Sequence, residues 1–188
     1  MSQNSVMIDL ETIATTANAT VLTIGAVRFD PYADEFTSAE AETLYLKIDL
    51  ASCEHLNLDA DDDTLAWWAT QPQEAQDEAF GDEGRVDIND AFHQLYKFCS
   101  NATYIWSHGA AFDVVICENI FRKLGKPIPW KFWNVRCTRT LFDLGITPYK
   151  PAETAHHALV DAYNQVLGVQ SVFKVLSEHS IFPLNSQR

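Results

Sequence analysis

Two acidic side chains stand inside an apolar stretch near the start of the chain, in Met7-Ile8-Asp9-Leu10-Glu11-Thr12. In a β-strand, residues at i and i+2 point to the same face, so the carboxylates of Asp9 and Glu11 would lie side by side. Burying two like charges costs several kcal/mol unless a cation or hydrogen-bond donors compensate. Because oxygen-only ligands favour Mg²⁺ or Mn²⁺, the pair indicates a divalent-metal site. The alternative is that Asp9 ends the strand and Glu11 is solvated.

A third acid, Asp113, follows another apolar segment and a glycine, Gly109. The glycine permits a tight turn into the helix that we expect next. An aspartate at a helix start also commonly caps the helix or interacts with its dipole, and this interpretation of Asp113 stays open.

The fourth acid, Asp161, belongs to the sequence His156-His157-Ala158-Leu159-Val160-Asp161, at the start of a predicted long helix. If Leu159 and Tyr163 face the core, Asp161 lies on a flank of this helix that can reach a cleft. His156 precedes the helix or sits in its first turn. Histidines are often bystanders on the surface or in the core, and we expect that of one member of this pair.

These residues must be positioned by strands and helices that the hydrophobic pattern predicts. Branched apolar runs and alternating segments predict five strands, at residues 6–10, 21–29, 43–49, 103–106 and 134–137. Helical spacing and capping signals predict helices that begin near Asp61 and at residues 87–99, 113–124 and 158–175. Strands followed by helix-strand alternation indicate an α/β domain with a mixed sheet. We expect residues 180–188 to form a loose tail.

The 188 residues suit one domain, and 47% hydrophobic residues are enough to build a core. Neither a long apolar run nor a secretory signal is visible, so we expect a cytoplasmic protein without a membrane span. The four cysteines have no paired spacing and are interpreted as reduced thiols.

The net charge of −13 argues at first against a nucleic-acid partner. Residues 122–150, however, carry seven basic residues and one aspartate, a local net charge of +6, so the remainder carries −19. This stretch is either a chance cluster or a surface that binds a nucleic-acid strand.

The order Asp-x-Glu-Thr, Phe-Asp and His-x-Ala-Leu-x-Asp resembles the DEDDh branch of the DnaQ-like exonucleases. Segments 64–71, 106–113 and 132–141 are similar to the subgroup of phage exonuclease A, ribonuclease AS and exonuclease VIII, so the resemblance covers about residues 6–170. It implies a ribonuclease H-like fold with a central mixed five-stranded sheet flanked by helices. A single domain would then span residues 1–188, with its core at about 6–177.

The resemblance implies a metal-dependent 3′-to-5′ exonuclease that converts single-stranded DNA or RNA to nucleoside 5′-monophosphates. Two Mg²⁺ or Mn²⁺ ions would be held, one by Asp9, Glu11 and Asp161 and the other by Asp9 with Asp113. The general base lies five residues before the last aspartate in this family, which selects His156 over His157. The partner would be a single strand with a free 3′ end, and homodimers are frequent among similar exonucleases.

The same resemblance suggests several contacts with the substrate. The backbone near the paired acids would meet the terminal 3′-hydroxyl, an aromatic ring would wedge near the end bases, and one of Trp67 and Trp68 would stack on a base, with Trp68 slightly preferred. The predicted substrate-binding residues are Leu10, Thr12, Trp68, His108, Phe112, Arg136 and Arg139. Ion pairs with nearby acids are an alternative role for the two arginines. The subgroup commonly has Asn at position 108 and Asp at position 137, where this chain has His108 and Cys137, which leaves substrate preference open.

Two other functions were considered. A haloacid-dehalogenase phosphatase also opens with two acids and a threonine, but it needs Asp at the position of Glu11 and does not fit the His-x-Ala-Leu-x-Asp segment. A catalytically silent module of the same fold would be favoured by a missing carboxylate, and none is missing. No G-x-G-x-x-G follows the first strand, which argues against dinucleotide binding.

Overall fold

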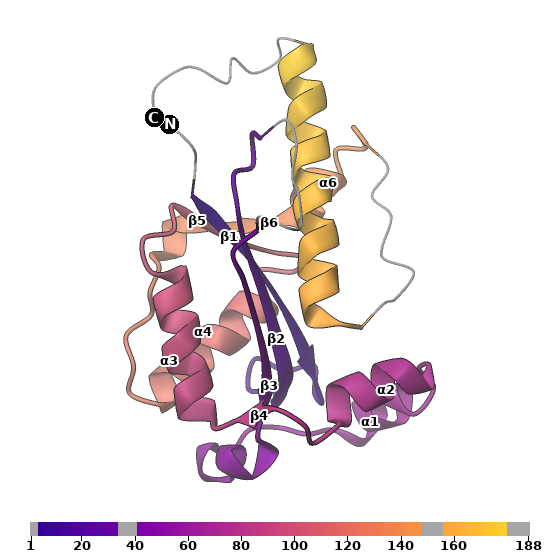
Figure 1. The fold of residues 1–188 in the computed structure, drawn as a ribbon, viewed down its shortest axis with the longest axis vertical. Helices are drawn as coiled ribbons and strands as arrows, with labels where there is room; N and C mark the ends of the chain where they lie inside the picture. Colours follow the sequence, from indigo (N-terminus) through magenta and orange to yellow (C-terminus); the bar gives the residue numbers. More distant parts are fainter. Residues whose placement is uncertain (1–3, 34–40, 148–155, 180–188) are drawn as a thin grey trace.

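A computed structural model describes residues 4–33, 41–147 and 156–179 (Figure 1). Its centre is a six-stranded sheet with the order β4-β3-β2-β1-β5-β6, in which β1, β2 and β3 are antiparallel and the β1/β5, β5/β6 and β3/β4 pairs are parallel. The strands are β1 Ser5–Thr12, β2 Val21–Phe29, β3 Thr43–Ile48, β4 Arg85–Val86, β5 Tyr104–Ser107 and β6 Val135–Cys137. The predicted α/β fold with a mixed sheet is confirmed. The sheet has one strand more than expected, because β4 is only two residues long and shows no sequence pattern.

Helices cover both faces of the sheet. They are α1 Asp62–Trp68, α2 Gln73–Phe80, α3 Ile88–Cys99, α4 Asp113–Lys123, α5 Thr138–Phe142 and α6 Ala158–Glu178, with 3-10 turns η2 Leu50–Leu56 and η3 Phe132–Asn134. In Figure 1, α3 and α4 lie on one side of the sheet and α6 on the other, while α1 and α2 lie beyond one end of the strands. The predicted helices thus correspond to α1, α3, α4 and α6. The predicted tail, residues 180–188, lies outside the described residues.

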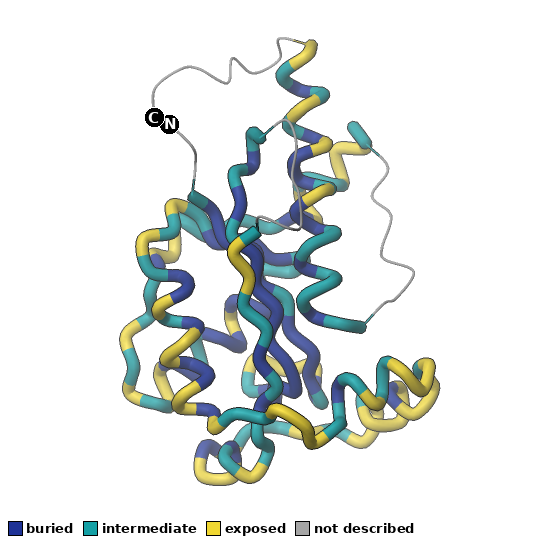
Figure 2. The backbone as a smooth tube through the Cα atoms, viewed as in Figure 1, coloured by how far each residue is buried: buried dark blue, intermediate teal, exposed yellow. Residues whose placement is uncertain are grey.

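Strand β1 shows how the sheet orients the acidic pair. Val6, Ile8 and Leu10 are buried in the core that α3 and α4 cover, and Met7 is buried among residues of α6. Because side chains alternate along a strand, Asp9 and Glu11 share the face of Met7 and point toward α6. The buried central strands, dark blue in Figure 2, hold this orientation from both sides.

A glycine in β2 fixes how closely α6 approaches the sheet. Gly25 pairs with Asp9 of β1 on one side and with Tyr45 of β3 on the other. A Cβ atom at Gly25 would lie 2.2 Å from the carbonyl carbon of Ala158, the first residue of α6. Since backbone atoms cannot yield to such a clash, only glycine lets the first turn of α6 rest on the strand beside Asp9.

All four cysteines are free thiols in the structure. Among the described residues, none of the helices combines the length and the apolar character that crossing a membrane requires.

Candidate active site

Three carboxylates from two distant parts of the chain meet where β1 faces the first turn of α6. Asp9, Glu11 and Asp161 each offer an oxygen, and these oxygens lie within 4.8 Å of one another. Glu11 is only 8% exposed, so its charge is largely removed from water. An all-oxygen donor set of this size suits a hard divalent cation such as Mg²⁺ or Mn²⁺.

Asp113 adds a fourth carboxylate from the start of α4. The chain turns from β5 into α4 through Gly109, whose φ of +143° favours glycine. Since β1 pairs with β5 only over Ser5–Met7, the backbone N–H of Leu10 is available to Asp113 and donates to its Oδ1 at 3.3 Å. Asp113 is therefore tied to β1 beside the three clustered acids, rather than acting as a cap exposed to solvent.

Burial raises the pKa values of all four acids, and repulsion by neighbouring carboxylates raises those of Asp9 and Glu11 further. Burial raises the pKa of Asp9 well above its usual range, and the charges of Asp113 and Glu11 raise it further. Burial, together with the charges of Asp161 and Asp113, raises the pKa of Glu11 to about 8. Burial likewise raises the pKa of Asp113 to about 7 and that of Asp161 above its usual range. Without a cation the cluster holds protons near neutral pH, so the residues present fit a site that a divalent cation completes.

A buried glutamine on α6, not predicted from the sequence, orients the Asp9 carboxylate. Gln165 is 3% exposed and lies one helical turn after Asp161, and its Nε2 donates to Asp9 Oδ1 at 2.7 Å. This bond occupies one carboxylate oxygen and leaves the other for a cation. The i+4 spacing from Asp161 is the sequence signal that indicates Gln165, because residues so spaced share a helix face.

His156 lies at the entrance to α6 and contacts the same carboxylates through its backbone. Its φ of +74° is uncommon for a residue with a side chain, and its N–H donates to Asp161 Oδ2 at 3.0 Å. The imidazole lies edge-on to Trp67 and Trp68, with ring centroids 4.8 and 5.9 Å away. The turn therefore presents the ring toward α1, beside the acidic cluster.

The neighbouring His157 has a different environment. Its ring stacks on Tyr45 with centroids 4.6 Å apart, and its Nε2 lies 4.0 Å from Glu78 of α2. The Tyr45 hydroxyl donates to the same Glu78 carboxylate at 2.6 Å. Because Tyr45 pairs with Gly25, this stack fixes the start of α6 directly beside the point where the helix touches the sheet.

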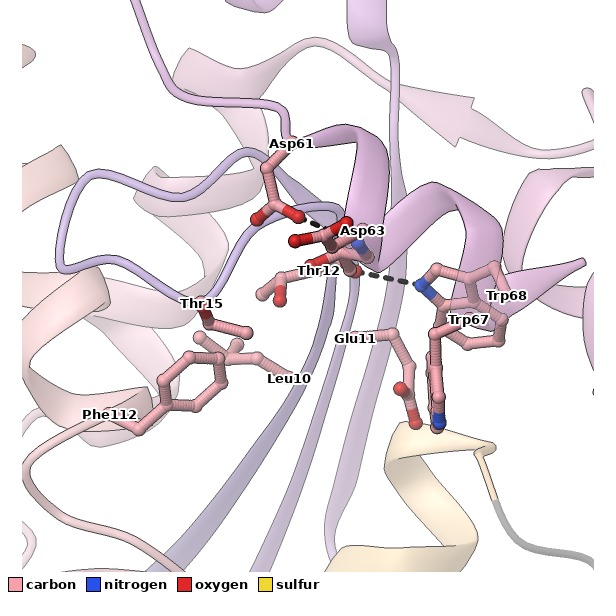
Figure 3. Close-up of a pocket in the computed structure, with 10 residues that line it drawn as sticks. Leu10, Glu11, Thr12, Thr15, Asp61, Asp63, Trp67, Trp68 and Phe112 are labelled. Atoms are coloured by element: carbon pink, nitrogen blue, oxygen red, sulfur yellow. Dashed lines mark hydrogen bonds between the residues drawn. The ribbon is translucent and has the colours of Figure 1, made fainter.

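A cavity of about 580 Å³ opens beside Glu11 (Figure 3). In Figure 3, Phe112 and Leu10 form one side of the cavity and Trp67 stands beside Glu11 on the other. The cavity is lined by Leu10, Glu11, Thr12, Thr15, Asp61, Asp63, Thr64, Trp67, Trp68 and Phe112. Four of the predicted substrate-binding residues, Leu10, Thr12, Trp68 and Phe112, therefore line it. The sequence indicated Asp61 and Asp63 only as a helix start.

The two tryptophans differ in exposure, and the more exposed one is not the one preferred from the sequence. Trp68 is 2% exposed and its indole N–H donates to the Thr12 carbonyl oxygen at 2.8 Å, which anchors α1 to the end of β1. Trp67 is 43% exposed and is the tryptophan with an accessible face. Helical geometry explains the difference, because adjacent residues on a helix point in directions about 100° apart.

The remaining predicted substrate-binding residues are Arg139, His108 and Arg136, and they differ in how close to the acids they lie. The Arg139 Nε donates to the His108 carbonyl oxygen at 3.0 Å and lies beside Gly109, close to Asp113. His108 itself contacts Thr138 through Nδ1 at 2.8 Å, and burial, with the charge of Arg139, lowers its pKa. Arg136 lies 4.1 Å over the ring of Tyr104, at the opposite end of β5 from the acids. Neither His108 nor Arg136 lines the cavity.

The sheet order and the four acids on β1, α4 and α6 define the class as a DnaQ-like nuclease on a ribonuclease H-like fold, as the motifs predicted. A family model described as the 3′-5′ exoribonuclease Rv2179c-like domain matches residues 4–173. The chain belongs to this family, and the predicted class of 3′-5′ exonuclease is thereby confirmed. No curated protein has a sequence that matches the chain significantly.

Solved structures with the same fold include two nuclease groups. A zinc-bound complex of E. coli exonuclease I with single-stranded DNA has a TM-score of 0.62 and 15% identity, and the match covers 96% of this chain and 42% of that one. The RNase domain of the yeast Pop2 protein has a TM-score of 0.52 and 13% identity, with 96% and 78% coverage. The Mg²⁺- and Mn²⁺-bound S. pombe Pop2p has a TM-score of 0.51 and 10% identity, with 97% and 86% coverage. The chain spans less than half the length of the exonuclease I chain.

The Gln165 bond to Asp9 predicts a specific effect on metal affinity. Gln165→Met removes the donor but keeps an unbranched side chain of similar size. Mutating a residue that hydrogen-bonds to a metal ligand typically lowers metal affinity about 10–100-fold. We therefore expect the Kd for Mn²⁺, measured by isothermal titration calorimetry, to rise by that factor. Gln170→Met is the matched control, since Gln170 is also buried in α6 but donates to the Asp30 carbonyl oxygen. Equal losses of affinity in both variants would contradict the role of Gln165.

The raised pKa of Glu11 predicts how the stability of the metal-free protein depends on pH. Between its ordinary value of 4.5 and about 8, the folded protein keeps the Glu11 proton while the unfolded chain has lost it. Raising the pH through this window therefore favours unfolding, and Glu11→Gln should flatten the slope. Calorimetry in chelator measures the effect, because each 1 kcal/mol shifts Tm by about 2–4 °C for a chain of this size. A Tm that rises with pH across this window, or the same slope in Glu11→Gln, would refute the assignment.

Proposed function

We propose that this protein hydrolyses single-stranded nucleic acid from the 3′ end and releases nucleoside 5′-monophosphates. The observation that carries the proposal is the cluster of Asp9, Glu11 and Asp161 oxygens within 4.8 Å, next to the buried Asp113 and open to a cavity. A buried cluster of acids is costly to maintain without cations, so its presence is best explained by metal-dependent chemistry.

Two divalent ions, Mg²⁺ or Mn²⁺, complete the proposed site. Asp9, Glu11 and Asp161 would hold one, and Asp9 with Asp113 the other. When bound, such ions make a water molecule more acidic and offset negative charge on the entering and leaving oxygens of an in-line phosphoryl displacement. The role of the protein is to fix its carboxylates, which Gln165 does for Asp9 and the Leu10 N–H does for Asp113.

His156 is the proposed general base. Its imidazole takes a proton from the attacking water as the new oxygen–phosphorus bond forms and the bond from phosphorus to the 3′-oxygen of the preceding nucleotide breaks. The shortened strand leaves with a 3′-hydroxyl and can be cut again. His157 is less suited to this role, because it is stacked on Tyr45 and faces Glu78.

The cavity beside Glu11 is the proposed pocket for the terminal nucleotide. Leu10 and Thr12 line it near the acids, and Phe112 and the exposed Trp67 offer aromatic faces for bases. Stacking accepts any base, which suits a strand cut without sequence preference. Asp61 and Asp63 on its wall favour an uncharged sugar and base over a phosphate.

A cytoplasmic location and a homodimer stay predictions from the sequence.

The activity is tested with 5′-labelled single-stranded DNA and RNA oligonucleotides in Mg²⁺, in Mn²⁺ and in chelator. We expect a ladder that shortens one nucleotide at a time from the 3′ end with either metal, and no products in chelator. Asp161→Asn should abolish the ladder, whereas the exposed Asp90→Asn on α3 should not. Intact DNA and RNA in every metal condition, with folded wild-type protein, would favour a silent binding module.

Substitutions of the adjacent His156 and His157 test which of the two is the general base. His156→Ala should lower kcat by about 10²–10⁴, the usual contribution of a general base, with little change in KM. His157→Phe keeps an aromatic ring against Tyr45 and should retain most of kcat. Steady-state kinetics on one labelled oligonucleotide distinguishes the two. A larger loss of kcat in His157→Phe than in His156→Ala would contradict the assignment of His156 as the general base.

A further inference from the structure

Two adjacent aromatic side chains are strongly exposed at the β6 edge of the sheet. Phe132 and Trp133 of η3 are 81% and 60% exposed, and their rings meet edge to face with centroids 4.8 Å apart. They immediately precede β6, the last strand in the sheet order. Large exposed aromatic pairs are unfavourable in water and commonly mark a surface that binds a partner.

The surroundings of this pair are basic, although the protein is acidic. The described residues 122–147 contain six basic residues and one acidic residue, a net charge of +5 in a chain of net −13. Lys131 and Arg136 flank the aromatic pair, and within the described part of the chain neither forms an ion pair with a carboxylate. We call Lys131, Phe132, Trp133 and Arg136 the edge surface.

Arg136 of the edge surface lies on the same side of the sheet as the acidic pair. Arg136 pairs with Trp106, and Trp106 pairs with Met7, so Arg136 shares the sheet face of Met7, Asp9 and Glu11. Its guanidinium donates to the Trp133 carbonyl oxygen at 2.8 Å, which holds the positive charge beside the aromatic pair.

Arg139, three residues further along the chain, lies beside Gly109 and Asp113. The six residues from Trp133 to Arg139 span at most about 20 Å, a distance that a few nucleotides of an extended strand can cover. The chain thus places positive charge both at the edge surface and beside Asp113.

We propose that the edge surface binds the part of a single-stranded nucleic acid that lies several nucleotides from the 3′ end being cleaved. Bases stack on Phe132 and Trp133, and phosphates lie near Lys131 and Arg136, the combination that binds single strands without sequence preference. The inference rests on the proposed exonuclease function and specifies where its substrate extends beyond the cavity.

A second copy of the chain fits the surface less well. In a two-fold symmetric dimer the same patch faces itself, so Lys131 and Arg136 would meet their own counterparts, and this repulsion disfavours pairing. A polyanion instead complements both cations.

The test compares substrates of two lengths that share the same 3′ sequence, a trinucleotide and a 12-nucleotide strand. In the double variant Phe132→Ala/Trp133→Ala we expect KM for the 12-nucleotide strand to rise at least about fivefold, because each stacked base contributes about 1–3 kcal/mol. We expect kcat for both substrates and KM for the trinucleotide to stay unchanged, since the trinucleotide does not reach the surface. Leu167→Ala, on exposed α6 surface, is the matched control and should change neither KM.

A second variant tests the cations. Lys131→Ala/Arg136→Ala should reduce the salt dependence of KM for the 12-nucleotide strand, whereas Lys174→Ala on α6 should not. Unchanged KM for the long strand in the aromatic variant, or equal rises for both lengths, would overturn the proposal. So would a loss of dimers in analytical ultracentrifugation with KM unchanged.

A binding measurement distinguishes failure of the proposed exonuclease function from failure of the proposed edge surface. If the wild-type protein cleaves neither substrate, fluorescence anisotropy of a labelled 12-nucleotide strand compares the wild-type protein with the aromatic variant. Weaker binding by the variant keeps the edge surface as a nucleic-acid site in a protein that does not cleave these strands. Equal binding by the wild-type protein and the aromatic variant would overturn the proposed role of the edge surface.

Discussion

The repulsion among four carboxylates in a poorly solvated site is the constraint on which this structure depends. Burial raises the pKa values of Asp9, Glu11, Asp113 and Asp161, and the charges of neighbouring acids raise those of Asp9 and Glu11 further. Such an arrangement persists only because each acid is attached to a well-packed element, β1, α4 or α6, whose burial offsets the electrostatic cost. A fold that holds these acids close together therefore favours the binding of positive charge at this site.

Helix α6 is the element that does most to position the acids and His156. It carries Asp161, it supplies the Gln165 donor to Asp9, and the His156 turn lies at its start. Its first turn is seated on the backbone of Gly25, and the stack of His157 on Tyr45 fixes it laterally. Residues that contribute no carboxylate, such as Gly25 and Tyr45, therefore determine how close the carboxylates and the histidine stand.

The sequence predicted the main strands and three of the longer helices, because each leaves a local pattern of period or capping. It also indicated the four acids by their spacing and resemblance, and His156 by resemblance alone, and their roles stay predictions. It did not predict β4, α2 or α5, which are too short to show a period. Gln165 and Gly25 were missed for a different reason: their roles depend on which element packs against which, and that information is tertiary. The difference in exposure between Trp67 and Trp68 was missed likewise, since it depends on the rotation of α1 about its axis. The distance of Arg136 from the acids could not be inferred either, because it follows from the register of β6.

The place of α6 in the chain has a consequence for biosynthesis. A ribosome makes β1, with Asp9 and Glu11, at the beginning and α6 only after residue 157. Until that helix emerges, the growing polypeptide lacks one of the three clustered oxygens, the Gln165 donor and the His156 turn. Since a domain folds as a unit during synthesis, the sheet and the acidic cluster are completed together, once α6 has been made. A product of premature termination that lacks α6 would therefore lack a complete acidic cluster.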